Sequence, residues 1–344
     1  MDGRKVQKVG YSTLSISLPS NWVKEVGLKR GDTLFLVPEK DGSLKLLPSH
    51  QFKQKGVIDE YICNADLCEG PKMLERIVVG NYILGRDLLT VKSSERMHSE
   101  NIKEIRAIIR RLIGMGIIEE TQDHITLQCS IDPRKFHLDM LLRRLATISL
   151  TIVSEAVQAL VDLDESIAKE AIDREDEADM VYLLAMRLLT SAQRNRDIAE
   201  EIGLEDPLQV LYFGLVLRYL ELIADYAEEI ARGVIDLLQR NKDRLPRQLI
   251  EKISDMADQA RNLVLQSIDC FFMCDIRTAN NILGMLTSIK QERDRLIQLL
   301  PEIPHLDLIV WNITRIADRG AGIALKAINN ALERGTNICK KANH

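Results

Sequence analysis

Apolar residues follow two different periods along the chain, an alternating one near the N-terminus and a helical one in the C-terminal part. The alternation predicts four short strands, at Val6–Val9, Leu14–Leu18, Thr33–Val37 and Ser43–Leu47. Gly10 and Asp41-Gly42 supply turns. Between the two strand pairs, Pro19-Ser20 opens a short helix over Asn21–Val26. Because residues 1–50 bury too little surface to be stable alone, we expect this module to dimerise.

From residue 133 onwards, the helical period and its capping residues predict six long helices. The helices begin near Asp132-Pro133, Asp164, Asp206-Pro207, Pro246, Asp275 and Pro304. The last five end near Arg194, Leu238, Met273, Leu300 and Thr336. This pattern predicts a mainly α body of two tandem three-helix bundles, 133–240 and 246–344.

The two bundles are internal repeats of one another. Ile223-Ala224-Asp225 recurs as Ile316-Ala317-Asp318, an offset of 93 positions. A second group of residues recurs at an offset of 111 positions, as Asp164, Ala168 and Ile172 become Asp275, Ala279 and Leu283. Constant offsets within each matched pair of helices indicate duplication of one structural unit.

The middle segment, residues 51–132, mixes both periods and predicts a small α/β connector. Its expected elements are helices at Met73–Tyr82 and Glu100–Gly114, a strand at Leu88–Lys92, and a hairpin of Ile117–Glu120 with His124–Cys129. A basic helix followed by a hairpin resembles a winged helix and would give a second DNA contact. A solvated helix face explains the same charges.

Charge is divided unevenly along the chain. Residues 1–56 carry ten basic and five acidic residues, a net +5, which leaves −10 for the remainder because the whole chain carries −5. A basic head on an acidic body favours different partners for the two ends.

The six cysteines form no CxxC pair, and scattered reduced thiols explain Cys63 and Cys68 more simply than a metal or redox pair does. No apolar window approaches the roughly 18 residues that span a bilayer, and no signal peptide is evident, so we expect a cytoplasmic protein without membrane insertion.

The main candidate chemistry lies on the second long helix. One helical seam contains Ala168, Ile172, Glu175, Asp179, Tyr182, Met186 and Leu189. Glu175 and Asp179 therefore occupy positions expected to be apolar, where burial is costly and like charges at i,i+4 repel. A bound cation would offset this cost. The alternative is that such carboxylates form salt bridges, for example Glu221 with Arg218 or Asp225 with Arg232.

The N-terminal module resembles the SpoVT/AbrB/MazE family of swapped-hairpin domains. The matching residues are Lys5-Val6-Gln7-Lys8-Val9-Gly10, Ser12, Ser15-Ile16-Ser17-Leu18-Pro19, Leu28 and Gly31-Asp32. The resemblance implies an interleaved dimer that binds DNA through its paired strands. By the same resemblance, the expected DNA contacts are Arg4, Lys5, Lys8 and Ser12. A module that only dimerises remains the alternative.

The body resembles the PhoU family of phosphate-uptake regulators, which consist of two three-helix repeats with paired carboxylates at i,i+4. The matching elements are Glu175-x-x-x-Asp179, Glu221-Leu222-Ile223-Ala224-Asp225 and the degenerate copy Thr314-Arg315-Ile316-Ala317-Asp318. An AbrB-like head joined to such a body resembles the archaeal members of these regulators. The resemblance implies a divalent metal ion (Mg, Mn, Fe, Zn or Ca) held by Glu175, Asp179, Glu221 and Asp225.

The second repeat departs from this pattern, since Leu286, Lys290 and Thr314 stand opposite Glu175, Asp179 and Glu221. Only Asp318 remains of the acidic set, so we expect metal in the first bundle alone. In that bundle Glu221 and Asp225 flank the apolar seam rather than lie in it, which predicts a partly open site.

Three functions are compatible with the sequence. The first is a DNA-binding regulator of phosphate uptake that senses phosphate status through its metal-binding body. The second is a scaffold without DNA binding that docks on a phosphate ABC transporter ATPase subunit or a kinase to inhibit it. In either case we expect a homodimer or higher even oligomer, and the transporter ATPase subunit is a further possible partner. A phosphoryl-transfer enzyme is the weakest, because no nucleophile–base pair or P-loop accompanies the carboxylates, and we expect no enzyme activity.

Overall fold

A computed structural model describes residues 3–11, 13–38, 42–49, 60–241, 245–301, 303–336 and 338–339. The chain divides into two compact units, Met1–Ile58 and Asp59–His344. Long helices make up most of the second unit, so the fold is mainly α, as the sequence predicts.

The N-terminal unit consists of two separate hairpins and one short helix. Strands β1 (Gln7–Val9) and β2 (Thr13–Ser15) pair antiparallel, as do β3 (Leu34–Pro38) and β4 (Leu44–Pro48). Helix α1 (Ser20–Glu25) lies between the two hairpins in sequence. The expected elements are all present, although β2 ends three residues early, and Asp41 lies outside the described residues.

Apolar side chains of this unit face water. Val9 is 56% exposed, Leu14 69% and Leu36 60%. Among the described residues, the buried clusters begin only at Ala65, in the second unit. A single copy of the N-terminal unit therefore leaves its hydrophobic surface uncovered, which is unfavourable in water.

The connector is a four-stranded sheet with two helices. In chain order its elements are β5 (Glu60–Asn64), α2 (Met73–Ile83), β6 (Leu88–Lys92), α3 (Ser99–Ile109), β7 (Met115–Glu120) and β8 (His124–Cys129). The strand order is β5-β6-β8-β7, with β5 parallel to β6 and the other pairs antiparallel. A parallel pair joined by a helix is a βαβ unit, so the winged-helix interpretation is wrong. The sequence patterns had missed β5.

Helix α3 is shorter than predicted because turns replace its last part. The helix ends at Ile109, and Gly114 adopts a left-handed conformation with φ 78°. Arg106 pairs with Glu120 of β7 at 2.9 Å, so its charge is used within the connector. This pairing favours a surface helix face over a DNA-contacting one.

The helical body follows the connector. Its helices are α4 (Leu138–Asp162), α5 (Glu165–Arg194), α6 (Arg196–Glu201), α7 (Pro207–Asn241), α8 (Arg247–Met273), α9 (Ile276–Leu299) and α10 (Leu306–Arg334). Asp164 and Asp275 cap α5 and α9 as predicted, by accepting hydrogen bonds from backbone N–H groups two residues on. Asp132 instead caps a short 3₁₀ turn at Pro133–Lys135, so the prediction that it opens α4 is wrong. The short α6 was not predicted.

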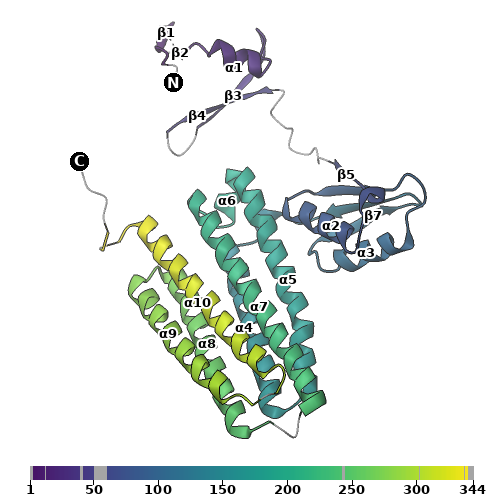
Figure 1. Ribbon diagram of the computed structural model, residues 1–344. Helices are drawn as coiled ribbons and strands as arrows, with labels where there is room; N and C mark the ends of the chain where they lie inside the picture. The colour runs from purple at the N-terminus through teal and green to yellow at the C-terminus, as the bar shows by residue number, and fades with distance from the viewer. Residues whose placement is uncertain are drawn as a thin grey trace. The chain divides into compact units, whose positions relative to one another are not determined.

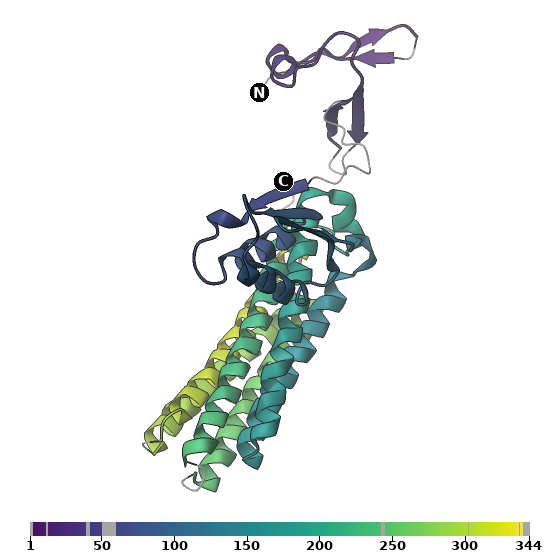
Figure 2. The ribbon, with the colours of Figure 1, turned by 90° about the vertical axis from the view of Figure 1, so that its right-hand side faces the viewer.

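The two three-helix bundles share one continuous core. Helices α4, α5 and α7 pack together, as do α8, α9 and α10, and the bundles meet where α7 packs on α10 and α4 on α8. Their axes run side by side along the body (Figures 1 and 2). By length and composition, α4 and α7 are apolar enough to cross a membrane, contrary to the sequence expectation. Both place apolar residues such as Leu145 and Leu220 fully inside the core.

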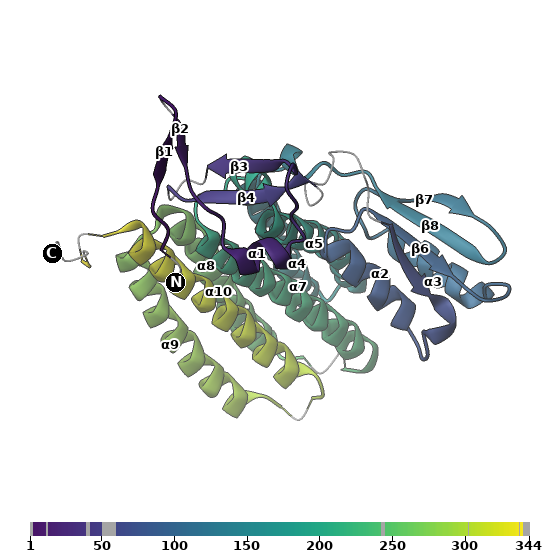
Figure 3. The ribbon, with the colours of Figure 1, turned by 90° about the horizontal axis from the view of Figure 1, so that it is seen from above.

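The connector docks on α5, on the side of the body away from α9 (Figures 1 and 3). Arg187 of α5 is 1% exposed and donates to the backbone oxygens of Tyr82 at 2.8 Å and Arg86 at 3.2 Å. It also forms an ion pair with Asp87. Leu183, also on α5, belongs to the connector's own buried cluster. The connector is therefore packed on the first bundle through both polar and apolar contacts.

Close packing of α10 on α8 depends on a glycine. A Cβ on Gly320 would lie 2.5 Å from Leu263 Cδ2 and 2.9 Å from Val264 Cγ2. We expect Gly320→Ala to destabilise the protein by about 1–3 kcal/mol, because the core has no room for the methyl group. The matched variant Gly284→Ala on α9 meets nothing within 4 Å and should stabilise it by about 0.5–1 kcal/mol through helix propensity. Urea unfolding of both variants tests this, and equal midpoints would contradict it.

Candidate functional site

Glu175 and Asp179 lie at the edge of the core rather than in its centre. The buried side chains of α5 in this region are Ala171, Ala178 and Val181. The predicted seam is thus displaced around the helix, and Glu175 and Asp179 are only partly buried. On α7 the prediction is correct, since Leu220 and Ala224 are fully buried and the carboxylates flank them.

Glu221 is the most buried of the four carboxylates. Its side chain lies on α7 beside fully buried Leu220, and the residue is 8% exposed. One of its oxygens, Oε2, is buried without a hydrogen-bond partner. A buried carboxylate oxygen without a partner is costly, so this atom indicates a position where a cation or a water would be favourable.

All four predicted ligands come together between α5 and α7. The charge of Asp179 raises the pKa of both Glu221 and Asp225 across the helix pair. The charge of Asp225 in turn raises the pKa of Glu175. The carboxylates of α5 and α7 therefore influence one another's ionisation, and we refer to the four of them as the acidic cluster.

Burial and mutual repulsion raise every pKa in this cluster. Burial is the largest cause at each residue and, with neighbouring carboxylates, raises the pKa of Glu175 to about 8, of Glu221 to about 7 and of Asp225 to about 6. Burial also raises the pKa of Asp179, although Arg111 opposes the shift. Glu228 of α7 adds to the repulsion on the other acids. Full ionisation would therefore leave the cluster with more negative charge than its surroundings neutralise.

Two arginines partly compensate this charge. Arg218 pairs with Glu221 on α7, so that part of the salt-bridge alternative is confirmed. Arg232 pairs with Glu228 at 2.6 Å rather than with Asp225, so the other part is wrong. Arg111, which follows α3 of the connector, pairs with Asp179 and lies 3.2 Å from Asp176 Oδ1. Sequence reasoning had missed Arg111 and Glu228 as members of the site.

A cavity of about 420 Å³ opens beside the cluster, between the connector and the bundle. Asp179, Tyr182 and Glu221 form its bundle side, and Arg111 and Arg76 belong to its connector side. The oxygen donors around it are those that hard divalent cations prefer. In the part of the chain that the structure describes, no three acidic, histidine or cysteine side chains are already gathered as metal ligands. The donor chemistry fits a divalent cation, provided that carboxylates now paired with arginine turn towards it.

The second bundle shows what the same positions do without the acidic set. Lys290, opposite Asp179 in the repeat, pairs with Asp318 at 2.8 Å. This contact joins α9 to α10 at the positions that Asp179 and Asp225 occupy on α5 and α7. Thr314, opposite Glu221, is buried and donates to the backbone oxygen of Val310 at 3.0 Å. The second bundle thus compensates Asp318 with its own lysine.

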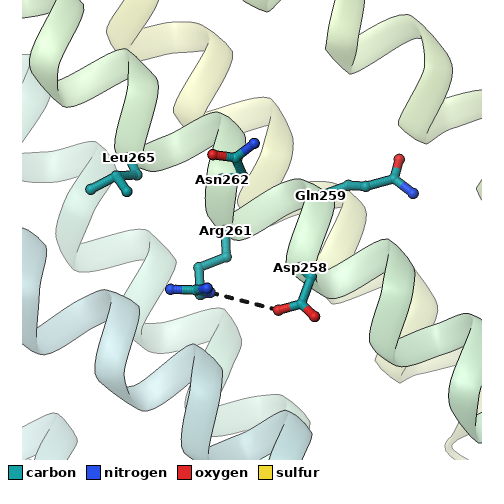
Figure 4. Close-up of a pocket in the computed structure, with 5 residues that line it drawn as sticks. All are labelled: Asp258, Gln259, Arg261, Asn262 and Leu265. Atoms are coloured by element: carbon teal, nitrogen blue, oxygen red, sulfur yellow. Dashed lines mark ion pairs between the residues drawn. The ribbon is translucent and has the colours of Figure 1, made fainter.

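The remaining candidates have structural explanations. Asp173, Asp176 and Glu177 of α5 are exposed and form a solvated face of the helix. Burial, together with Cys68, raises the pKa of Cys63 to about 11, which keeps it a thiol at neutral pH. A shallow hollow on α8, drawn in Figure 4, holds Arg261 paired with Asp258 at 3.7 Å beside two amides and Leu265. It gathers no excess of either charge.

The predicted DNA contacts lie on and just before the first hairpin. Lys8 is on β1, directly opposite Leu14 of β2, and Arg4 and Lys5 precede the strand. All three are exposed. Ser12 lies outside the described residues. The basic side chains are therefore accessible to a partner on one end of this hairpin.

The chain matches two families of known domains. Residues 142–234 match the family model of the PhoU domain. This PhoU-like region runs from α4 into α7 and contains all four carboxylates. Residues 7–54 match the model described as antidote-toxin recognition MazE, bacterial antitoxin. The two domain types are therefore those that the sequence resemblance named.

Comparison with solved structures also finds a similar chain. The crystal structure of PhoU from Pseudomonas aeruginosa is 19% identical, with a TM-score of 0.49, over 58% of this chain and 96% of that chain. No curated protein matches the chain.

Proposed function

We propose that this protein is a DNA-binding regulator of phosphate uptake, whose PhoU-like body senses phosphate status through a divalent metal ion. The observation that carries the proposal is the combination of a MazE-like module with a PhoU-like domain in one chain. The first type of module suggests DNA binding and dimerisation, and the second suggests phosphate homeostasis. The acidic cluster supplies the sensing site within the matched PhoU-like region.

In this proposal the head acts as a dimer on DNA. The exposed apolar side chains of its hairpins would be covered by a second copy, as in an interleaved dimer. The exposed Arg4, Lys5 and Lys8 would then neutralise phosphates, and Ser12 would hydrogen-bond to the backbone or a base edge. The acidic body would stay clear of DNA because its net charge is unfavourable there.

In the body, Glu175, Asp179, Glu221 and Asp225 would hold the metal ion. When bound, the ion would offer open coordination positions to a phosphate oxygen. We propose no enzyme activity, because no nucleophile–base pair accompanies the carboxylates. The site of action would be the cytoplasm, with a phosphate transporter ATPase subunit as a further partner.

Titration of full-length protein into labelled duplex DNA from upstream of phosphate-transport genes tests the proposal. We expect binding that weakens steeply as salt rises, because phosphate neutralisation releases counterions. If the protein binds no DNA at any salt concentration, the regulator proposal fails. The scaffold that docks on a transporter ATPase or kinase then becomes the better account.

Metal content tests the sensing site. We expect purified wild-type protein to retain a divalent metal and Asp179→Ala to lose most of it, because Asp179 is central to the acidic cluster. Asp173→Ala is the matched control, an exposed acid on the same helix. Elemental analysis of the three proteins measures the difference. Equal metal content in wild type and Asp179→Ala would refute the ligand assignment.

A further inference from the structure

Arg111 is the one cation of the acidic cluster that comes from outside the bundle, within the described residues. It lies in the turns between α3 and β7 of the connector, 68 positions from Asp179 in sequence. Its guanidinium is paired with Asp179, and its buried Nε lies 3.2 Å from Asp176 Oδ1 as an ion pair that lacks hydrogen-bond geometry. The guanidinium therefore engages a carboxylate oxygen of Asp179, which the metal ion of the proposed function would also use.

The internal repeat shows why this position requires a cation. In the second bundle Lys290 neutralises Asp318 directly across the helix pair. In the first bundle both equivalent positions are acidic, as Asp179 and Asp225, so neither position supplies a cation to the other. Arg218 of α7 pairs with Glu221 and opposes the rise in the pKa of Asp225. Asp179 itself is paired with Arg111 of the connector.

Among the described residues, Arg111 also forms a polar attachment between the connector and α5. Another is buried Arg187, which is bonded to the backbone at Tyr82 and Arg86. Asp179 and Arg187 are separated by eight residues of helix, about 12 Å along its axis. The cavity of about 420 Å³ lies at the Asp179 end, beside Ile108 and Leu183. The Arg187 end is tightly packed, whereas the Arg111 end has space around it.

We propose that Arg111 and a divalent cation compete for Asp179, so that metal binding releases one end of the connector from the bundle. This inference rests on the metal site proposed above and adds its means of output. When a cation takes Asp179, Arg111 loses its main partner, and the connector stays attached through Arg187. Because the connector joins the head and body in sequence, the competition links the sensing cluster to the segment that follows the head.

Calorimetric titration of metal-free protein with Mn²⁺ tests the competition. We expect Arg111→Ala to bind Mn²⁺ at least about tenfold more tightly than wild type, because no guanidinium has to be displaced. Arg106→Ala is the matched control, since it removes an arginine of α3 that pairs with Glu120 away from the cluster. It should bind Mn²⁺ as wild type does.

Hydrogen exchange supplies a second readout. In wild type, Mn²⁺ should speed exchange in the end of α3 and the turns that follow it, but not in α8. In Arg111→Ala this region should exchange faster even without metal, with little further change on adding Mn²⁺. The Arg187 contact should keep the backbone around Tyr82 protected in every case.

The possible outcomes separate the two proposals. If wild type and Arg111→Ala bind Mn²⁺ equally, the competition is refuted and the metal site stands. If Mn²⁺ binds more tightly to Arg111→Ala without any change in exchange of wild type, the coupling to the connector is refuted. If neither protein binds Mn²⁺, both the competition and the metal site are wrong, and DNA binding by the head is unaffected.

Discussion

Replacing Arg4 and Lys8 by alanine should weaken binding of the full-length protein to duplex DNA by about a hundredfold at moderate salt. Both side chains are exposed, Lys8 on β1 and Arg4 three residues before that strand. A plot of log affinity against log salt concentration has a negative slope, and each phosphate that is no longer neutralised should make that slope shallower by about 0.9. Fluorescence anisotropy with labelled DNA at several salt concentrations measures both quantities. In a dimer each substitution acts twice, which accounts for the size of the effect.

A charge-matched variant distinguishes direct phosphate binding from general electrostatics. Lys24→Ala/Lys29→Ala removes the same charge from the same module, at exposed positions on and after α1. We expect the DNA affinity of this variant to fall by less than about tenfold relative to wild type, because steering by distant charge is screened beyond about 10 Å at 0.1 M salt. Equal weakening in the two variants would show that the hairpin residues have no special role.

Much of the body could be predicted from sequence because its helices carry strong boundary signals. Asp164 and Asp275 cap helices as expected, and Lys290 and Asp318, which the repeat aligns with Asp179 and Asp225, lie in contact. The seam of α5 was misplaced because its core side is built largely from alanines such as Ala171 and Ala178. Alanine gives little contrast in a hydrophobic pattern, so the larger side chains at the edge of the buried face of α5 were taken for its centre.

The remaining parts of the site depend on tertiary packing. Arg111 reaches Asp179 only because the connector docks on α5. Arg187 stabilises this docking, although the helical period of α5 predicts that its position packs in the bundle core. No local pattern links residues so far apart. Strand β5 was missed for a similar reason, since its pairing partner β6 lies beyond an intervening helix. These long-range contacts are decided by the assembled fold rather than by any one segment.

Metal-free protein should lose stability as the pH rises from about 5 to 8.5, and Glu175→Gln should remove much of that loss. The folded-state pKa of Glu175 is about 8, against an ordinary value of 4.5. Between these values the folded protein holds a proton that the unfolded chain releases, so rising pH favours unfolding. At about 1.4 kcal/mol per pKa unit, reduced for partial exposure, Glu175 accounts for about 2 kcal/mol.

The sign of this dependence separates the acidic cluster from an ordinary set of surface salt bridges. Carboxylates stabilised by arginine have lowered pKa values and make a protein more stable as pH rises through the acid range. Here Arg111 and Arg218 do not overcome burial and repulsion, so the trend is reversed.

Urea unfolding at pH 5 and 8.5 should show wild type losing stability, Asp173→Asn losing the same amount, and Glu175→Gln losing markedly less. Saturating Mn²⁺ should restore wild type at pH 8.5, because the ion neutralises the ionised cluster and binds only the folded state. A wild type that is equally stable at both pH values would show that the arginines already neutralise the cluster, and the physical reason for a cation there would be lost.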